Sequence, residues 1–367
     1  MPVSPPTTTL QAIQTKVRRL TRSPSTSQLT DADLQNYINT FVVYDFPEHL
    51  RMFNLRSTYT FVCNPFQDQY PTDTDSFGGV TTNPLYDFQN KYISVHPPVY
   101  IAGYDSFYTQ SREQFYGVYP FTNSIQSTQI TGNGITQSFS GNLQTLLGAV
   151  GAGAVLLKNN VLFTSIDANG NGLALADVPL VSLTTGYQTV EGNLYTPQTQ
   201  PDVPPTTADF DATNYINYVT GDFVLTFSAP PASNAPILIQ SVPTVVGLPQ
   251  GVLYYDNTFY LRPVPDQPYN INIEVYARPT YLMETTSNPA LNEWWQYIAY
   301  GAAKKIFEDR MDMDSVQMIM PEFKKQETLC LRRTLVQYSN ERTATIYTEQ
   351  SSFGPGSGQW GWGGGPF

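Results

Sequence analysis

Residues 288–306 read NPALNEWWQYIAYGAAKKI, and this stretch decides how the chain is organised. Asn288 is placed to cap a helix. Pro289 suits the first helical position, because the N–H that proline lacks would have no hydrogen-bond partner there. A second helix is expected over 322–341, beginning after Pro321 because a proline ring clashes with the preceding turn. The apolar side chains of the first stretch recur at the three- and four-residue steps of one helix face: Leu291, Trp294, Trp295, Ile298, Ala302 and Ile306.

Residues 10–56, at the other end of the chain, carry matching helical signals. The first helix is expected to begin at Leu10 and to end at Ser23-Pro24. Thr30 is expected to be the N-cap of the next helix, with Asp33 at its third position. Neither end can bury its apolar stripe alone, so we expect the two ends to pack together.

The sequence between the two ends favours strands and turns. Alternation over 223–228, the turn at 229–234 and the apolar run 237–239 predict a hairpin. A second pair of strands is expected over 252–261, around the turn Asp256-Asn257. Further strands are predicted at 161–164, 215–218 and 271–276.

These patterns predict an α+β fold, in which the N- and C-terminal helices form a small bundle and a large β-sandwich or barrel-like domain is inserted between them. The expected boundaries are 1–56 for the N-terminal helices, 57–119 for an irregular Pro/Tyr-rich segment, 120–284 for the inserted β domain, 285–342 for C-terminal helices packing on the N-terminal ones, and 343–367 for a flexible Gly/Trp-rich docking tail.

Composition and charge narrow the class of protein. Of the 367 residues only 13% are charged, while 29 Pro, 25 Gly, 25 Tyr and 20 Phe indicate turn-rich β-structure rather than disorder. Residues 61–284 carry five basic and 17 acidic side chains, a net charge of −12, against 14 basic and 13 acidic in the remainder. Such an acidic region repels a phosphate backbone, which excludes a reader of nucleic acid but suits a surface that DNA slides past.

The sequence supplies no catalytic constellation. His49 and His96 are far apart, and neither lies near a nucleophile motif such as GxSxG, so we expect no enzyme, no catalytic residue and no cofactor. Cys63 and Cys330 lack CxxC partners and metal-ligand spacing, and we expect both to be reduced, buried thiols.

One loop resembles a calcium site. Asp167, Asn169, Asn171 and Gly172 match the first half of an EF-hand loop, but the twelfth position is Val178 instead of glutamate. An Asn-Gly turn joining two strands explains the loop without a metal, so we predict a hairpin and reject a calcium site.

Neither the N-terminal segment nor any apolar run of the sequence predicts a membrane protein. Residues 1–9 lack the pattern of a signal peptide, so the protein is expected to remain in the cytosol. The apolar run 146–157 contains three glycines in twelve residues and is too short to span a bilayer. A buried strand pair or loop is favoured over a membrane-active loop.

Residues 351–367 are uncharged and hold seven glycines. A segment so rich in glycine cannot repay its ordering entropy alone, yet exposed tryptophans favour aggregation unless they have a binding site. We therefore expect a docking tail rather than a solvated spacer. Its docking residues are expected to be Phe353, Trp360, Trp362 and Phe367.

Three segments resemble the head-to-tail adaptor proteins, also called head-completion or connector proteins, of tailed bacteriophages. LTDADLQNYIN at 29–39 is similar to the family's N-terminal helix start, and LNEWWQYIAYGAA at 291–303 to its later alanine-bearing helix. GDFVLTFSAPP at 221–231 resembles hairpins of virion β-domains. The insertion is larger than in the small adaptors, which suggests the larger podovirus-like version.

The resemblance implies a portal-associated neck ring of identical subunits, commonly twelve, that extends the DNA channel and joins capsid to tail. The implied partners are the portal protein, a tail or second neck ring protein, further copies of this chain, and passing DNA without sequence-specific binding, but no membrane. The implied location is the virion neck, after assembly in the host cytoplasm. In this view the acidic β-region borders the channel used in genome ejection, and the tail or the helices engage the portal.

The alternative is a virion fibre, decoration or receptor-binding β protein, whose tyrosines stack on carbohydrate. This alternative explains the aromatic β-region but leaves the helical ends without a role.

Overall fold

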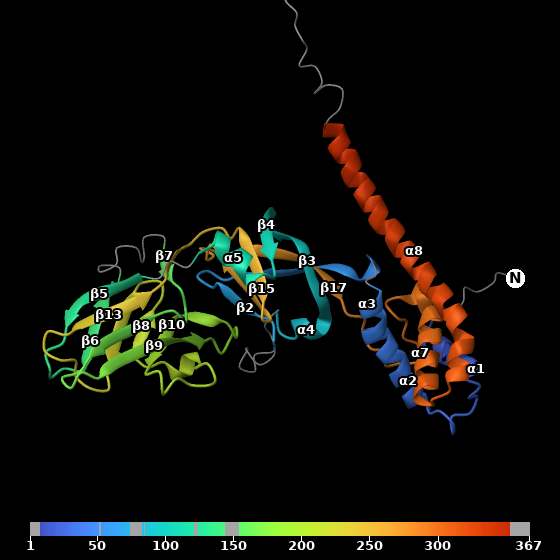
Figure 1. Ribbon diagram of the computed structural model, residues 1–367, viewed down its shortest axis with the longest axis horizontal. Coiled ribbons are helices and arrows are strands. Elements are labelled where there is room, and N and C mark those ends of the chain that lie inside the picture. The colour runs from blue at the N-terminus through green and yellow to red at the C-terminus, as the bar shows by residue number, and fades with distance from the viewer. Residues whose placement is uncertain are drawn as a thin grey trace, which may run out of the picture. The chain divides into compact units, whose positions relative to one another are not determined.

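A computed structural model describes residues 8–50, 53–73, 83, 85–120, 124–143 and 154–352. The chain divides into two units (Figure 1). A helical unit combines residues 1–57 with 276–367, and a β unit comprises residues 58–275. Over the described ranges, no helix is long and apolar enough to cross a membrane.

The helical unit begins with two capped helices. The side chain of Thr9 caps α1 (Leu10–Leu20) by accepting a hydrogen bond from the N–H of Ala12. Thr30 caps α2 (Asp31–Thr40), because its hydroxyl accepts a bond of 3.1 Å from the N–H of Asp33. The predicted cap at Thr30 is therefore confirmed. Beyond α2 the chain continues as a π-helix, η1 (Phe41–Asp45), then α3 (Phe46–His49) and the 3₁₀ turn η2 (Phe53–Leu55).

The chain returns to the helical unit after residue 276. The predicted cap at Asn288 is wrong, because the helix begins later, as η5 (Asn292–Trp294) followed by α7 (Trp295–Asp309). The preceding segment instead binds α1, since the carbonyl of Ser287 accepts a bond of 2.9 Å from the N–H of Leu10. This contact ties the two ends of the chain together.

The last helix, α8 (Met313–Ser352), contains Pro321 in its interior. The prediction that Pro321 precedes the helix is wrong. The side chains of Val316 and Phe323, before and after the proline, are both buried, so packing holds the helix together across the missing hydrogen bond. Within the helical unit, α7 packs against α1, α2 and α8, and the later part of α8 extends away from these neighbours (Figure 1).

Most of the β unit belongs to two curled sheets. The seven-stranded sheet has the order β1-β17-β3-β4-β15-β16-β2 and carries the short helices α4 (Phe88–Lys91) and α5 (Arg112–Val118) beside it. Its strands are β1 (Arg56–Val62), β2 (Gln69–Pro71), β3 (Tyr92–Ile101), β4 (Tyr104–Thr109), β15 (Gly251–Tyr255), β16 (Thr258–Arg262) and β17 (Asn270–Ala277).

The eight-stranded sheet has the order β5-β13-β8-β9-β10-β11-β12-β6. Its strands are β5 (Ser124–Thr131), β6 (Ser138–Asn142), β8 (Leu162–Ile166), β9 (Gly172–Val181), β10 (Gln188–Tyr195), β11 (Tyr215–Asn217), β12 (Asp222–Thr226) and β13 (Pro236–Ser241). The 3₁₀ turn η4 (Thr207–Asp209) lies between β10 and β11, and β7 (Ala154–Leu156) pairs separately with β14 (Pro243–Val245). Each large sheet encloses its own buried apolar cluster.

The predicted fold class is wrong. More of the chain lies in strands than in helices, and the helices are scattered along it, with α4 and α5 beside a sheet. The β-structure is also not one inserted domain over 120–284, because residues 57–119, expected to be irregular, supply four strands that pair with β15, β16 and β17. Pairing between strands so distant in sequence depends on tertiary packing, which local patterns do not encode.

The short-range strand predictions had mixed outcomes. The hairpin at Asp256-Asn257 is confirmed, with both residues at positive φ between the paired strands β15 and β16. The hairpin joining 223–228 to 237–239 is wrong, because β12 pairs with β11 and β6 while β13 pairs with β5 and β8.

Candidate functional site

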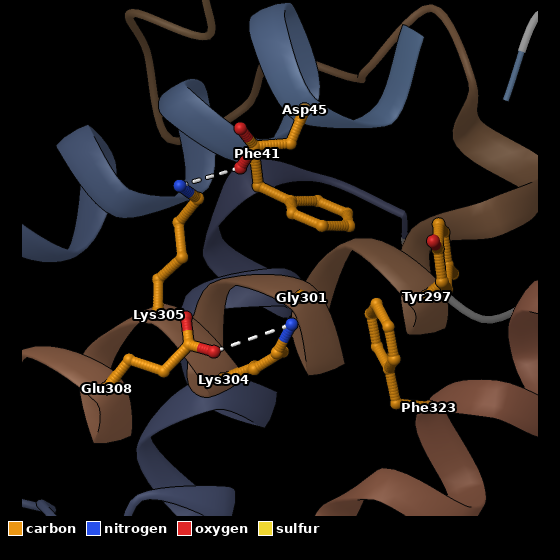
Figure 2. A pocket seen from close by; sticks show the side chains of 8 residues that line it. All are labelled: Phe41, Asp45, Tyr297, Gly301, Lys304, Lys305, Glu308 and Phe323. Atoms are coloured by element: carbon orange, nitrogen blue, oxygen red, sulfur yellow. Dashed lines mark ion pairs between the residues drawn. The ribbon is translucent and has the colours of Figure 1, made fainter. Parts of the chain in front are cut away.

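A pocket of about 490 Å³ lies within the helical unit, between η1, α7 and the first part of α8. Figure 2 shows it with a set of aromatic rings on one side and paired charges on the other. The lining residues are Phe41, Asp45, Tyr297, Gly301, Lys304, Lys305, Glu308 and Phe323. Its volume lies within the range of roughly 300–1,000 Å³ typical of sites that bind small ligands.

Three aromatic side chains form the apolar wall of this pocket. The rings of Tyr297 and Phe323 stack with centroids 5.0 Å apart, and Phe41 meets the Tyr297 ring edge-on at 5.4 Å. Offset and edge-to-face rings at these distances attract each other beyond their burial of area. The wall is therefore preformed, and only small parts of Phe41 and Phe323 (6% and 8% exposed) are accessible, while Tyr297 is fully buried behind them.

Gly301 allows Phe41 to reach this position. A Cβ atom at residue 301 would lie 2.2 Å from carbon atoms of the Phe41 ring, far inside van der Waals contact. The ring therefore packs directly on the backbone of α7. The π-helix that carries Phe41 is itself a rare form, found mostly as single turns and often at functional sites.

Two ion pairs lie at the opposite side of the pocket, as the dashed lines in Figure 2 show. Lys305 pairs with Asp45 across 2.7 Å, and Lys304 pairs with Glu308 across 3.4 Å. The ammonium of Lys304 also lies 5.5 Å from the centre of the Phe323 ring, a cation–π distance. The four charges cancel, so the pocket mouth is polar without net charge.

Two ionisable groups in and beside the pocket are neutral. Burial raises the pKa of the Tyr297 hydroxyl well above its usual value, so this group stays neutral. Burial likewise raises the pKa of the nearby Cys330 thiol to about 12, which keeps that sulfur un-ionised and unreactive. Together with the aromatic wall, these groups suit an uncharged, flat side chain.

The β unit holds a buried cluster of charges. Arg262 pairs with Asp68 across 2.9 Å, and both side chains are almost fully buried. The ammonium of Lys158 donates to the side-chain oxygen of Gln67 at 3.0 Å and to the carbonyl of Gln188 at 3.3 Å. Because Gln188 begins β10 and Arg262 ends β16, this cluster connects the two large sheets. Burial lowers the pKa of Lys158 to about 8, while the charge of Asp68 opposes the shift.

This cluster leaves the exterior of the β unit strongly acidic. Its sequence contains four basic and 16 acidic side chains. Of these, Lys158 and Arg262 are buried, and only Lys91 and Arg112 among the described basic residues of this unit face solvent. In the same described part, only Asp68 and Asp177 among the carboxylates are buried. The exposed surface therefore carries a large excess of negative charge.

The predictions made from the sequence for individual site residues differ in how they compare with the structure. Phe353, Trp360, Trp362 and Phe367 lie outside the described residues. The loop Asp167–Asn171 joins β8 to β9, with Ile166 opposite Gly172, which confirms the hairpin. The Asp167 carboxylate accepts bonds of 2.8 Å from the N–H groups of Asn169 and Asn171. Both cysteines are free and buried, as predicted.

The pocket was not predicted from the sequence, because its lining residues form no recognisable catalytic or binding motif. One local signal was present, because a glycine inside an alanine-bearing helix weakens that helix unless it permits a close contact. Comparison with known proteins adds no family, since no protein-family model and no curated protein matches the chain.

Proposed function

We propose that the protein is a structural subunit of a phage virion, a head-to-tail adaptor that forms a ring below the portal and extends the DNA channel. The portal protein and a tail-side protein are its proposed partners, and the virion neck is its proposed location. The local resemblance at 29–39 and 291–303 motivates the choice.

The acidic exterior of the β unit is the observation that carries this proposal. Burial of Lys158 and Arg262 removes half of the unit's cations from its surface. DNA is attracted by rows of Lys and Arg, and each phosphate contact retards it. A surface with few exposed cations lets a duplex pass without being held, which is the property that a channel wall needs.

A chain rich in aromatic residues and poor in charge also suits a subunit of an obligate assembly. Large permanent interfaces are enriched in Tyr, Phe and Trp and depleted in Lys. Closed rings use heterologous contacts, in which one face of each subunit meets a different face of the next. In this proposal the aromatic pocket and the Trp-bearing tail are the two different parts of the chain that meet in such a heterologous contact.

Negative-stain electron microscopy of the purified full chain tests the proposal. Rings of uniform diameter with a central hole are expected, and the protein should not retard duplex DNA in a native gel even at low salt. A monomer, or retention of DNA by the wild-type chain, contradicts the proposal.

One observation favours the carbohydrate-binding alternative. The hairpin formed by β3 and β4 exposes Tyr100 and Phe107 on one face, because Tyr100 lies opposite Asp105 and Phe107 follows Asp105 by two residues. Sugar rings stack on exposed aromatic rings of this kind. A compact trimer or monomer that binds glycans, with binding lost in Tyr100→Ala, would support this function instead.

A further inference from the structure

The pocket of the helical unit has an apolar wall and no net charge, so a matching occupant is uncharged and apolar or aromatic. A segment with these properties exists in the same chain. Residues 353–367 carry no charged side chain and hold two tryptophans, Trp360 and Trp362, separated by one glycine. Tryptophan is the side chain most enriched at binding hot spots, where it fills a pocket sheltered from water.

Chain geometry decides which copy of the pocket these tryptophans reach. Phe323 lies in the pocket and Ser352 ends the same helix, so the 29 intervening helical steps place them about 44 Å apart at 1.5 Å per residue. Trp362 follows Ser352 by ten residues, which span at most ~36 Å when fully extended. The tryptophans therefore fall short of the pocket in their own copy.

From these observations we propose that Trp360 and Trp362 of one copy of the chain occupy the aromatic pocket of a second copy. One indole packs against the accessible parts of Phe41 and Phe323, which line the pocket. The Lys304 ammonium, already at a cation–π distance from Phe323, lies where it can also contact an indole face. The ion pairs Lys305–Asp45 and Lys304–Glu308 leave no net charge to be neutralised by the uncharged tail.

This contact is heterologous, because a tail on one copy meets a pocket on the next. It deepens the proposed ring by naming one contact between neighbouring subunits. It rests on the proposed function only in one respect, namely that successive contacts of this kind close into a ring. The pairing of tail and pocket itself needs only two copies.

Binding of the isolated tail tests the pairing directly. A labelled peptide of residues 351–367 is titrated into protein truncated after Gln350, and its fluorescence anisotropy is followed. Saturable binding is expected, and a peptide with both Trp360→Ala and Trp362→Ala should bind more than tenfold more weakly, as is usual for the loss of an aromatic anchor. Equal binding of the two peptides overturns the proposal.

Pocket variants locate the site of binding. Lys304→Trp places an indole over Phe323 and should abolish peptide binding, whereas Lys324→Trp puts the same ring on an exposed position outside the pocket lining and should not. Circular dichroism and thermal unfolding verify that both variants fold. Binding that survives Lys304→Trp in a folded protein overturns the proposal.

Mixing full-length variants distinguishes exchange between copies from folding back within one copy. Chains with Lys304→Trp keep a working tail, and chains with Trp360→Ala and Trp362→Ala keep a working pocket. Mass photometry should detect complexes of two copies in the mixture that neither variant forms alone. Their absence from the mixture, with peptide binding intact, shows that the tail does not join copies and overturns the proposal.

The two proposals fail separately. Rings without peptide binding refute the pairing of tail and pocket but leave the adaptor ring standing. Peptide binding without rings refutes the adaptor ring but leaves the pairing.

Discussion

The ammonium of Lys158 donates a hydrogen bond of 3.0 Å to the side-chain oxygen of Gln67, and both side chains are buried inside the β unit. A buried ammonium is costly because it loses its hydration, and only part of that loss is repaid by two acceptors and the nearby Asp68. Four predictions follow from this ammonium, from the buried pair Arg262–Asp68, from the pocket of the helical unit and from the cap of α2.

The stability of the β unit should rise with pH above about 8. The pKa of Lys158 is lowered to about 8 in the folded chain, while in the unfolded chain it keeps its usual value of 10.5. Between these values the unfolded chain binds more protons than the folded chain, so the free energy of unfolding increases with pH. Below pH 8 Lys158 is charged in both the folded and the unfolded chain, so the full free-energy cost of burying its ammonium remains.

Urea unfolding between pH 7.5 and 9.5 measures this effect, in a range below the titration of ordinary tyrosines. Burial raises the pKa of the Cys63 thiol to about 11, so this group lowers the stability of the β unit as pH rises through the same range. The Lys158→Met variant keeps this effect and is the control, and the stability of the wild type minus that of the variant should rise with pH. A difference that stays flat or falls across this range contradicts the lowered pKa of Lys158.

Removal of one partner from the buried pair Arg262–Asp68 should be strongly destabilising. Asp68→Ala leaves the Arg262 charge buried without its partner, which costs about 3–5 kcal/mol. The double variant Asp68→Leu with Arg262→Met removes both charges and should recover most of this loss. Chemical denaturation of the wild type, Asp68→Leu, Arg262→Met and the double variant completes a double-mutant cycle, and additive effects would show that the two residues are uncoupled.

Gly301→Ala should destabilise the helical unit although alanine favours helix. The new Cβ atom meets the Phe41 ring, and such overpacking typically costs about 1–3 kcal/mol, more than the ~1 kcal/mol gained in helix propensity. Gly117→Ala in α5 is the matched control, because nothing lies within 4 Å of its Cβ position. Thermal unfolding should shift down for the first variant and not for the second.

Thr30→Ala should lower the free energy of unfolding by about 1 kcal/mol, because the N–H of Asp33 loses its acceptor at the start of α2. Thr30→Ser keeps a hydroxyl in place and should remain close to wild type. Urea unfolding followed by far-ultraviolet circular dichroism gives both values. An alanine variant as stable as the serine variant would show that the cap contributes nothing.

Features set by neighbouring residues could be predicted from the sequence. The cap at Thr30 depends on a hydroxyl three residues before an N–H, and the turn at Asp256-Asn257 depends on two residues that tolerate positive φ. Both are local, and both are present. Pro321 shows the limit of local reasoning, because tertiary packing of Val316 and Phe323 carries α8 across it.

Features that depend on distant partners could not be predicted. Nothing near β12 indicates that it pairs with β6 rather than with the next strand, β13. The pocket likewise needs η1 and α7, which are separated by the entire β unit. Only Gly301 is a local sign of the pocket. Phe41, whose ring this glycine accommodates, is far away in the sequence.

The packing of α1 and α2 against α7 also has a consequence for biosynthesis. The ribosome completes the entire β unit before it makes α7, so the apolar faces of α1 and α2 emerge long before their partner. Transiently exposed apolar surface promotes aggregation during synthesis. The helical unit therefore matures last, and a chain stalled within the β unit would carry two unpartnered amphipathic helices.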